Sequence, residues 1–242
     1  MSATLGIIDL GQTPDPGFRE ELARAAPGTH ILSEALLQDF TDAQVIALDD
    51  PEGVFPIHFP LPGGGRVSIP LAHFLPRAQA AVDRLVVAGA DVVVITCAGD
   101  FSSVRCSVPL VLPGRLSAAV VAAVLPGAAV AAVMPTAGQV APSVTKWTAL
   151  GLQPQVRWRV PAGEDPSAER GWRQLAQEFV ALQTAVTVLD CMGFDHRDAA
   201  VLRALTDRPV IVARELAVQV CASLLRGGGI DAPSALGQLS LA

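Results

Sequence analysis

Two of the four cysteines lie in similar segments, DVVVITCAGDF at 91–101 and AVTVLDCMGFD at 185–195. Each segment is a run of β-formers followed by a polar residue, the cysteine, one more residue and glycine. The pattern predicts that Cys97 and Cys191 lie just beyond the C-terminal ends of buried strands, where open α/β sheets bind ligands. Thiols can exchange protons with a bound substrate. Two thiols from two similar halves therefore suggest a site between them, and a cofactor-free racemase or isomerase with two thiol acid/bases.

Residues near the two cysteines are the candidates for shaping this site. Gly99 and Gly193 each follow a cysteine by two residues and allow the backbone to approach a ligand closely. The alternative is that each cysteine only fills space, as free cysteines often do; the repeat of the whole phrase favours the functional interpretation. Cys106 and Cys221 lack this context and are predicted to be packing residues. The expected substrate-binding residues are Asp9, Gln12, Thr13, Thr96, Ala98, Gly99, Thr136, Lys146, Asp190, Met192, Gly193 and Arg214.

Asp9, Lys146 and Arg214 are charged residues of this set whose possible contacts with a substrate can be considered separately. Asp9 ends the first strand and can hold a substrate ammonium, orient Cys97 or cap a helix. Lys146, the one lysine of the chain, and Arg214 can each bind a substrate carboxylate. Lys146 is equally consistent with a solvated helix face. A pyridoxal cofactor would need a Schiff-base lysine and a phosphate cup, and no Gly/Ser-rich cup accompanies Lys146.

Composition argues against several other classes of protein. The net charge is −6 and no basic run occurs, so nucleic acid is not an expected partner. No CxxC pair and no metal-like histidine spacing occur, so no metal is expected. The chain opens without a signal-peptide pattern, and Pro126-Gly127 divides the uncharged run 116–135, so we expect a cytoplasmic protein with no membrane span. The expected partner is a small-molecule substrate, without a cofactor, and the chain could form a homodimer.

Apolar strand-like runs alternate with amphipathic helix-like runs over most of the sequence. This alternation predicts an α/β fold with parallel sheets and helices on both faces. We expect strands at 4–9, 29–33, 91–96, 108–112, 128–134, 155–160, 185–190 and 209–213. We expect helices at 17–26, 71–88, 115–124, 138–149, 167–183, 196–206 and 214–226. The Gly-rich stretch near 53–70 breaks the pattern and predicts a β-hairpin.

The predicted elements divide into two lobes and a tail. Residues 1–113 are expected to form an N-terminal α/β lobe, completed by helix 214–226 packing back on it. Residues 114–213 are expected to form a C-terminal α/β lobe, and 231–242 a tail beyond Gly227-Gly228-Gly229.

The segment VTVLDCMGFDHRDAAVLRALTDRPVIVARELAVQVCASLL resembles the C-terminal signature of AroM-family proteins. The opening LGIIDLGQTPDPG is similar to the N-terminal loop of that family, and Lys146-Trp147 lies where the family also carries KW. The family resembles the aspartate/glutamate racemase superfamily. That resemblance implies two pseudo-symmetric flavodoxin-like lobes, a substrate in the cleft, and one cysteine from each lobe. One thiolate would remove the α-proton and the opposite thiol would return a proton to the other face.

Carried onto this chain, the resemblance implies Cys97 and Cys191 as that pair and Asp9 as the N-terminal acid. The motif TCAGD departs from the CNTA-like pattern of glutamate racemases, so glutamate is not the expected substrate. The leading hypothesis is cofactor-independent racemisation or epimerisation of a small carboxylated substrate, such as an amino acid or a hydantoin-like compound. The alternatives are a single-thiol lyase, hydrolase or decarboxylase, and a non-catalytic small-molecule binding or regulatory protein.

Overall fold

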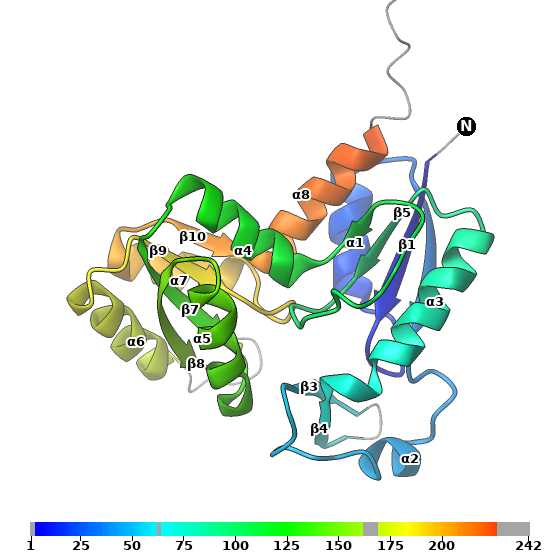
Figure 1. Cartoon of the computed structure of the whole chain (residues 1–242), viewed down its shortest axis with the longest axis horizontal. Coiled ribbons are helices and arrows are strands. Elements are labelled where there is room, and N and C mark those ends of the chain that lie inside the picture. The colour runs from blue at the N-terminus through cyan, green and yellow to red at the C-terminus, as the bar shows by residue number, and fades with distance from the viewer. Residues whose placement is uncertain (1–2, 62–63, 162–168, 227–242) are drawn as a thin grey trace, which may run out of the picture.

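The computed structural model describes residues 3–61, 64–161 and 169–226. It confirms the predicted α/β class, with two parallel four-stranded sheets in two lobes and a separate antiparallel strand pair (Figure 1). The predicted tail at 231–242 lies outside the described residues. None of the described helices has the length and apolarity that a bilayer crossing requires.

The N-terminal sheet has the strand order β2-β1-β5-β6, and all of its strands are parallel. Its strands are β1 (Thr4–Asp9), β2 (His30–Ala35), β5 (Val92–Ile95) and β6 (Leu110–Val111). The helices around it are α1 (Pro16–Ala25), η1 (Leu71–His73), α3 (Leu75–Val87) and α8 (Ala213–Arg226). A short helix α2 (Asp42–Ile46) precedes the antiparallel hairpin of β3 (Pro56–Pro60) and β4 (Arg66–Pro70).

The C-terminal sheet has the order β10-β9-β7-β8 and is also parallel. Its strands are β7 (Ala129–Met134), β8 (Gln153–Trp158), β9 (Val186–Leu189) and β10 (Val210–Val212). Its helices are α4 (Pro113–Val124), η2 (Ala137–Gln139), α5 (Val140–Thr148), α6 (Glu169–Ala181) and α7 (His196–Thr206).

The two parallel sheets have the same topology. Numbered in chain order within each sheet, both have the spatial order second, first, third, fourth. The order reverses between the first and third strands, which is the switch point at which open α/β sheets bind ligands. Cys97 follows the third strand of one sheet and Cys191 follows the third strand of the other. The sequence repeat therefore reflects equivalent positions in two similar sheets.

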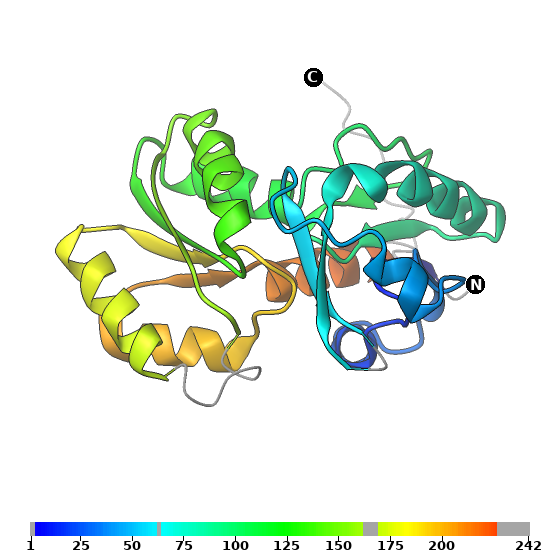
Figure 2. The same ribbon diagram turned by 90° about the horizontal axis from the view of Figure 1, so that it is seen from below.

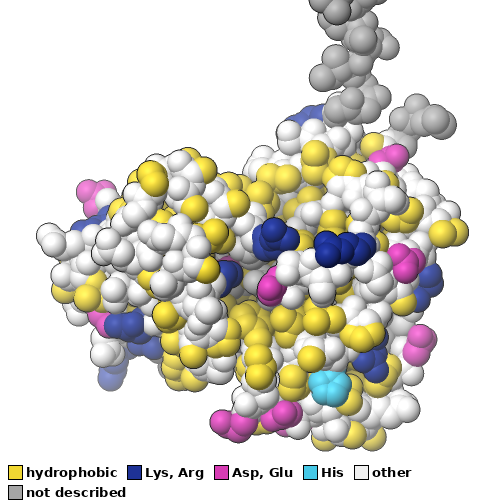
Figure 3. All heavy atoms as spheres, in the orientation of Figure 1, with side chains coloured by type: hydrophobic (Ala, Val, Ile, Leu, Met, Phe, Trp, Pro, Cys, Tyr) yellow, Lys and Arg dark blue, Asp and Glu magenta, His cyan; other side chains and the backbone are white. Residues whose placement is uncertain are grey.

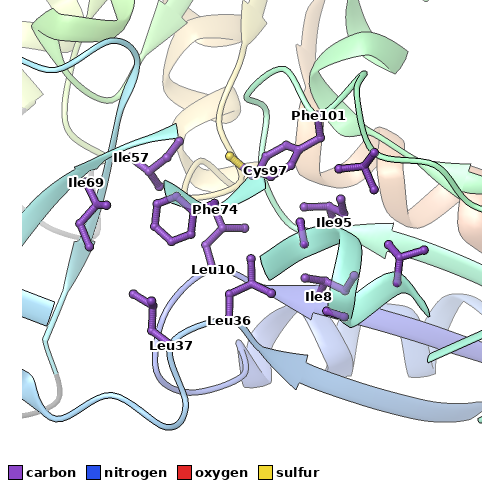
Figure 4. Close-up of a cluster of buried hydrophobic side chains, with 14 of the residues drawn as sticks. Ile8, Leu10, Leu36, Leu37, Ile57, Ile69, Phe74, Ile95, Cys97 and Phe101 are labelled. Carbon is purple, nitrogen blue, oxygen red and sulfur yellow. The ribbon is translucent and has the colours of Figure 1, made fainter. Parts of the chain in front are cut away.

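Each face of each sheet has its own apolar core. On the N-terminal sheet, α3 covers one face and the hairpin side chains extend the same apolar cluster; Figure 4 shows Cys97 in this cluster with Phe74 and Phe101. The other face packs against α1 and α8, where Cys221 is completely buried beside Phe18. Helix α8 thus joins the core of the N-terminal sheet although it follows the last strand of the C-terminal sheet.

The hairpin brings the two lobes into direct contact. Figure 2 shows it over the line where the lobes meet. Gln139 Nε2, in η2, donates a hydrogen bond to Pro56 O of β3 at 2.7 Å. Phe55 packs against apolar clusters of both lobes, and its φ of 53° is unusual for a residue other than glycine. Phe55 therefore has this unusual backbone conformation at the contact between the lobes. The hairpin that follows it forms part of the wall between them.

Three details of the secondary structure differ from the prediction. The single helix predicted at 138–149 is the 3₁₀ turn η2 followed by α5. The single helix predicted at 71–88 is a 3₁₀ turn followed by α3, because Pro76 occupies the first turn of α3 and favours a new helix start there. Helix α2 was not predicted: it has only five residues, and a capping box between Thr41 and Gln44 stabilises it. The remaining element boundaries agree with the prediction to within a few residues.

Candidate active site

A cavity of about 610 Å³ lies between the lobes, a size typical of small-molecule sites. Its lining comes from the segments after β1, β5, β7, β8 and β9, from the hairpin, and from the N-terminal parts of α1, α7 and α8. Figure 3 shows acidic and basic side chains close together where the two lobes meet. Of the residues predicted from the sequence, the following line the cavity: Asp9, Gln12, Thr13, Thr96, Cys97, Ala98, Gly99, Asp190, Cys191, Met192, Gly193 and Arg214. Thr136 and Lys146 are not among the lining residues.

The two cysteines have matching local geometry. The backbone N–H of Gly99 donates to Cys97 Sγ at 3.3 Å, and the backbone N–H of Gly193 donates to Cys191 Sγ at 3.4 Å. A hydrogen bond donated to sulfur favours the thiolate over the thiol. Each half of the chain therefore presents a thiol to the same cavity with one amide available to stabilise its charge.

The surroundings of the two thiols differ. Cys97 is buried, and Cys191 is partly exposed. Burial is the largest cause raising the pKa of Cys97, to about 12; the Gly99 amide opposes it, and charge on Cys191 and Asp190 reinforces it. At neutral pH the Cys97 sulfur therefore carries its proton. None of the four cysteines is in a disulfide.

Asp9 and Thr96 are joined at the carboxyl ends of adjacent strands β1 and β5. Thr96 Oγ1 donates to Asp9 Oδ1 at 2.8 Å, while no donor among the described residues lies within hydrogen-bonding distance of Asp9 Oδ2 in good geometry. Asp9 is only 4% exposed. Burial and, more weakly, the charge of Asp15 raise its pKa to about 6, whereas the Thr96 hydroxyl and, more weakly, the backbone N–H of Asp15 lower it. Asp9 is therefore a buried carboxylate that loses its proton just below neutral pH.

Asp190, directly before Cys191, forms a partly buried ion pair with Lys146 of α5. The carboxylate of Asp190 is fully buried, and its Oδ1 has no hydrogen-bond partner. The Lys146 ammonium also lies 5.1 Å from the centroid of the Trp147 ring. Lys146 was expected to bind a substrate carboxylate; in the structure its charge is already paired with Asp190.

Arg214 was the second expected anion-binding residue, and it too has acidic partners. Its guanidinium donates to Asp15 at 2.6 Å, to Glu21 at 2.9 Å and to the carbonyl of Met192 at 3.1 Å. Asp15 also caps the N-terminus of α1 by accepting from Gly17 N. Arg214 thus links α1, α8 and the Cys191 loop at the edge of the cavity.

Sequence reasoning missed the part of the lining that comes from the hairpin and from interlobe packing. Phe55, His58 and Gln139 all line the cavity. The hairpin was predicted, but its placement over the cleft depends on contacts such as Gln139 to Pro56, 83 residues apart. Within the described ranges, no group of three or more His, Cys, Asp or Glu side chains is arranged to hold a metal ion.

Solved structures share this architecture. An allantoin racemase from Pseudomonas fluorescens superposes with a TM-score of 0.59 at 21% identity, over 93% of this chain and 92% of that one. A glutamate racemase from Bacillus anthracis gives 0.62 at 12% identity, over 94% and 83%. A maleate isomerase from Pseudomonas putida S16 gives 0.59 at 14% identity, over 93% and 94%. At these identities the likeness establishes the fold.

No curated protein matches the sequence. The family model described as AroM protein matches residues 5–225, nearly the whole chain. The predicted resemblance is thereby confirmed, and the chain belongs to the AroM family.

Proposed function

We propose that this protein is a cofactor-independent racemase or epimerase in which Cys97 and Cys191 are the two acid/bases. The substrate is a small carboxylated or hydantoin-like compound bound in the cavity between the lobes. One observation carries the proposal: two thiols line one cavity. Each thiol follows the third strand of its sheet, and each accepts a hydrogen bond from the backbone N–H of the residue two positions later. Racemisation needs an acid and a base on opposite faces of one carbon, and in this proposal the thiols of the two equivalent halves take those two roles.

The proton transfers are written from a Cys97 thiol that holds its proton. In one direction the Cys191 thiolate removes the proton of the substrate carbon, and the electron pair moves into the adjacent carbonyl to form an enolate. Cys97, which holds its proton at neutral pH, then protonates the opposite face. The products are the inverted carbon, a Cys191 thiol and a Cys97 thiolate. The Gly99 amide stabilises that thiolate, and the opposite enantiomer runs the same steps in reverse.

The racemases and the isomerase with this fold are consistent with such chemistry, and so is a further similar structure, an arylmalonate decarboxylase with a TM-score of 0.59 at 16% identity. The decarboxylase is the reason to keep a second candidate function. A single-thiol lyase or decarboxylase would use one cysteine to protonate one face of a carbanion. The unequal burial of Cys97 and Cys191 is compatible with that chemistry.

Solvent deuterium exchange at the substrate carbon tests the proposal. Wild-type protein should racemise the substrate and incorporate deuterium from either enantiomer. Cys97→Ser and Cys191→Ser should each abolish racemisation, and each should keep exchange for at most one enantiomer. Cys106→Ser is the matched control, since Cys106 does not line the cavity, and it should behave as wild type. Full racemisation by either single-site variant rules out the two-thiol mechanism, and loss in only one variant favours the single-thiol alternative.

A further inference from the structure

The charges around the cavity indicate which substrates it accepts. We propose that the cavity binds a small neutral amide or ureide that donates N–H groups to Asp9 and Asp190, and that it excludes dicarboxylates. In such a substrate the reacting carbon lies beside a neutral carbonyl. This inference rests on the proposed function for the reaction at that carbon, while the binding preference can be measured without turnover.

The lining side chains have an excess of negative charge, and their cations are already paired. The acidic lining residues are Asp9, Asp15, Glu21, Asp190 and Asp195. The arginines that line the cavity are Arg197 and Arg214. Arg214 donates to Asp15 and Glu21, and Arg197 donates to Asp195 at 2.6 Å. The chain segments outside the described ranges contain no Lys, Arg or His. A dicarboxylate would therefore add two negative charges where every described lining Arg already has an acidic partner.

The two central acids have acceptor atoms without donors. Asp9 Oδ2 and Asp190 Oδ1 are buried and have no hydrogen-bond partner among the described residues. Asp9 is 4% exposed and Asp190 is fully buried. A buried acceptor without a donor is costly, and an N–H donor from a ligand relieves that cost. Each lobe contributes one of these carboxylates. Asp9 accepts a hydrogen bond from Thr96, the residue before Cys97, and Asp190 directly precedes Cys191.

The chemistry of the reacting carbon favours the same substrates. Removing a proton next to a neutral amide carbonyl makes a singly charged enolate, whereas removing one next to a carboxylate makes a dianion. The second charge is unfavourable beside Asp9. The charges of Cys191 and Asp190 both raise the pKa of the Cys97 thiol, and the charge of Lys146 partly opposes them. A neutral ureide avoids the dianion and supplies the missing N–H donors.

The test uses 5-benzylhydantoin, which has two ring N–H donors, and its 1,3-dimethyl derivative, which has none. Glutamate and maleate represent the dicarboxylates. Binding is measured by thermal shift and calorimetry on the wild-type protein, and deuterium exchange is measured in parallel against a buffer blank. We expect the hydantoin to bind, N-methylation to weaken binding about tenfold or more, and the dicarboxylates to produce no shift. The tenfold loss follows from removing hydrogen bonds to charged acceptors.

Carboxylate variants separate lost hydrogen bonds from the added bulk of the methyl groups. In Asp9→Asn the penalty for N-methylation should be clearly smaller than in the wild type, since one of the two charged acceptors is gone while Asp190 remains. Asp39→Asn, which changes an exposed carboxylate outside the cavity, should keep the full penalty. Asp190→Asn is a second variant for the same comparison. Because it breaks the ion pair with Lys146, it is the variant at risk of not folding, and Asp9→Asn alone then tests the proposal.

The outcomes for the binding preference and for the proposed function are distinct. N–H-dependent binding of the hydantoin without any exchange would support the substrate class and refute the racemase. Stronger binding of glutamate or maleate than of the hydantoin would overturn the substrate class, even if those compounds were isomerised. Absence of hydantoin binding, or a methylation penalty that is unchanged in Asp9→Asn, would also overturn it.

Discussion

Replacing Asp9 with asparagine should remove a pH-dependent loss of stability. Burial raises the pKa of Asp9 from 3.8 to about 6 in the folded state. Between these values the folded protein keeps the Asp9 proton while the unfolded chain has released it. The unfolded state therefore binds fewer protons, so this carboxyl lowers the free energy of unfolding as pH rises through the window. Asparagine does not titrate and keeps an oxygen that can accept from Thr96.

The magnitude follows from the shift in pKa. A difference of about 2 units corresponds to about 3 kcal/mol, the full destabilisation by ionised Asp9 above pH 7. About 2 kcal/mol of this develops between pH 4.5 and pH 7.5. The difference in unfolding free energy, Asp9→Asn minus wild type, should therefore be about 2 kcal/mol more favourable to the variant at the higher pH.

Urea unfolding without ligand, followed by tryptophan fluorescence, measures this difference directly, since the chain has three tryptophans. Taking the difference between variant and wild type cancels the titration of the other carboxylates. The exposed control Asp39→Asn should show no comparable trend with pH. A difference between Asp9→Asn and wild type that stays constant from pH 4.5 to 7.5 would refute the reasoning, because Asp9 would then have an ordinary pKa.

Two further substitutions test the structure around the cysteines. Lys146→Met should lower the free energy of unfolding by about 3 kcal/mol, because it leaves the buried charge of Asp190 unpaired; adding Asp190→Asn to that variant should restore much of the loss in the same urea titration. Gly114→Ala should cost about 2 kcal/mol and impair turnover, since its Cβ would lie 2.0 Å from the carbonyl oxygen of Ala98, in the Cys97 loop. Gly171→Ala, also in a helix, would meet only the flexible side chain of Arg159, so its melting temperature should stay close to that of wild type.

The positions of the two cysteines in the fold could be predicted from local sequence. Runs of β-formers that end in a polar residue and Cys identify strand ends, and parallel strands align their carboxyl ends at one edge of a sheet. The same reasoning places Asp9 and Thr96 at that edge, where they form a hydrogen bond. These predictions depend on residues close in sequence and on the geometry common to all parallel sheets.

The roles of the charged residues could not be predicted in this way. Lys146 and Arg214 are sequence candidates for binding a substrate carboxylate, yet Lys146 pairs with Asp190, 44 residues away, and Arg214 pairs with Asp15, 199 residues away. No local pattern encodes pairings over such distances, because they depend on how the helices dock against the sheets. Phe55, directly before the hairpin strand β3, lines the cavity for the same reason.

The sequence by itself determined the α/β class, the repeated strand–cysteine unit and the family resemblance, because these depend on periodicity and short motifs. Only the tertiary structure decided that both thiols line one cavity, that Cys97 is buried enough to hold its proton, and that the nearby cations are already paired. Burial and charge balance are sums over residues brought together from the whole chain. The proposed preference for a neutral N–H donor over a dicarboxylate therefore follows from packing.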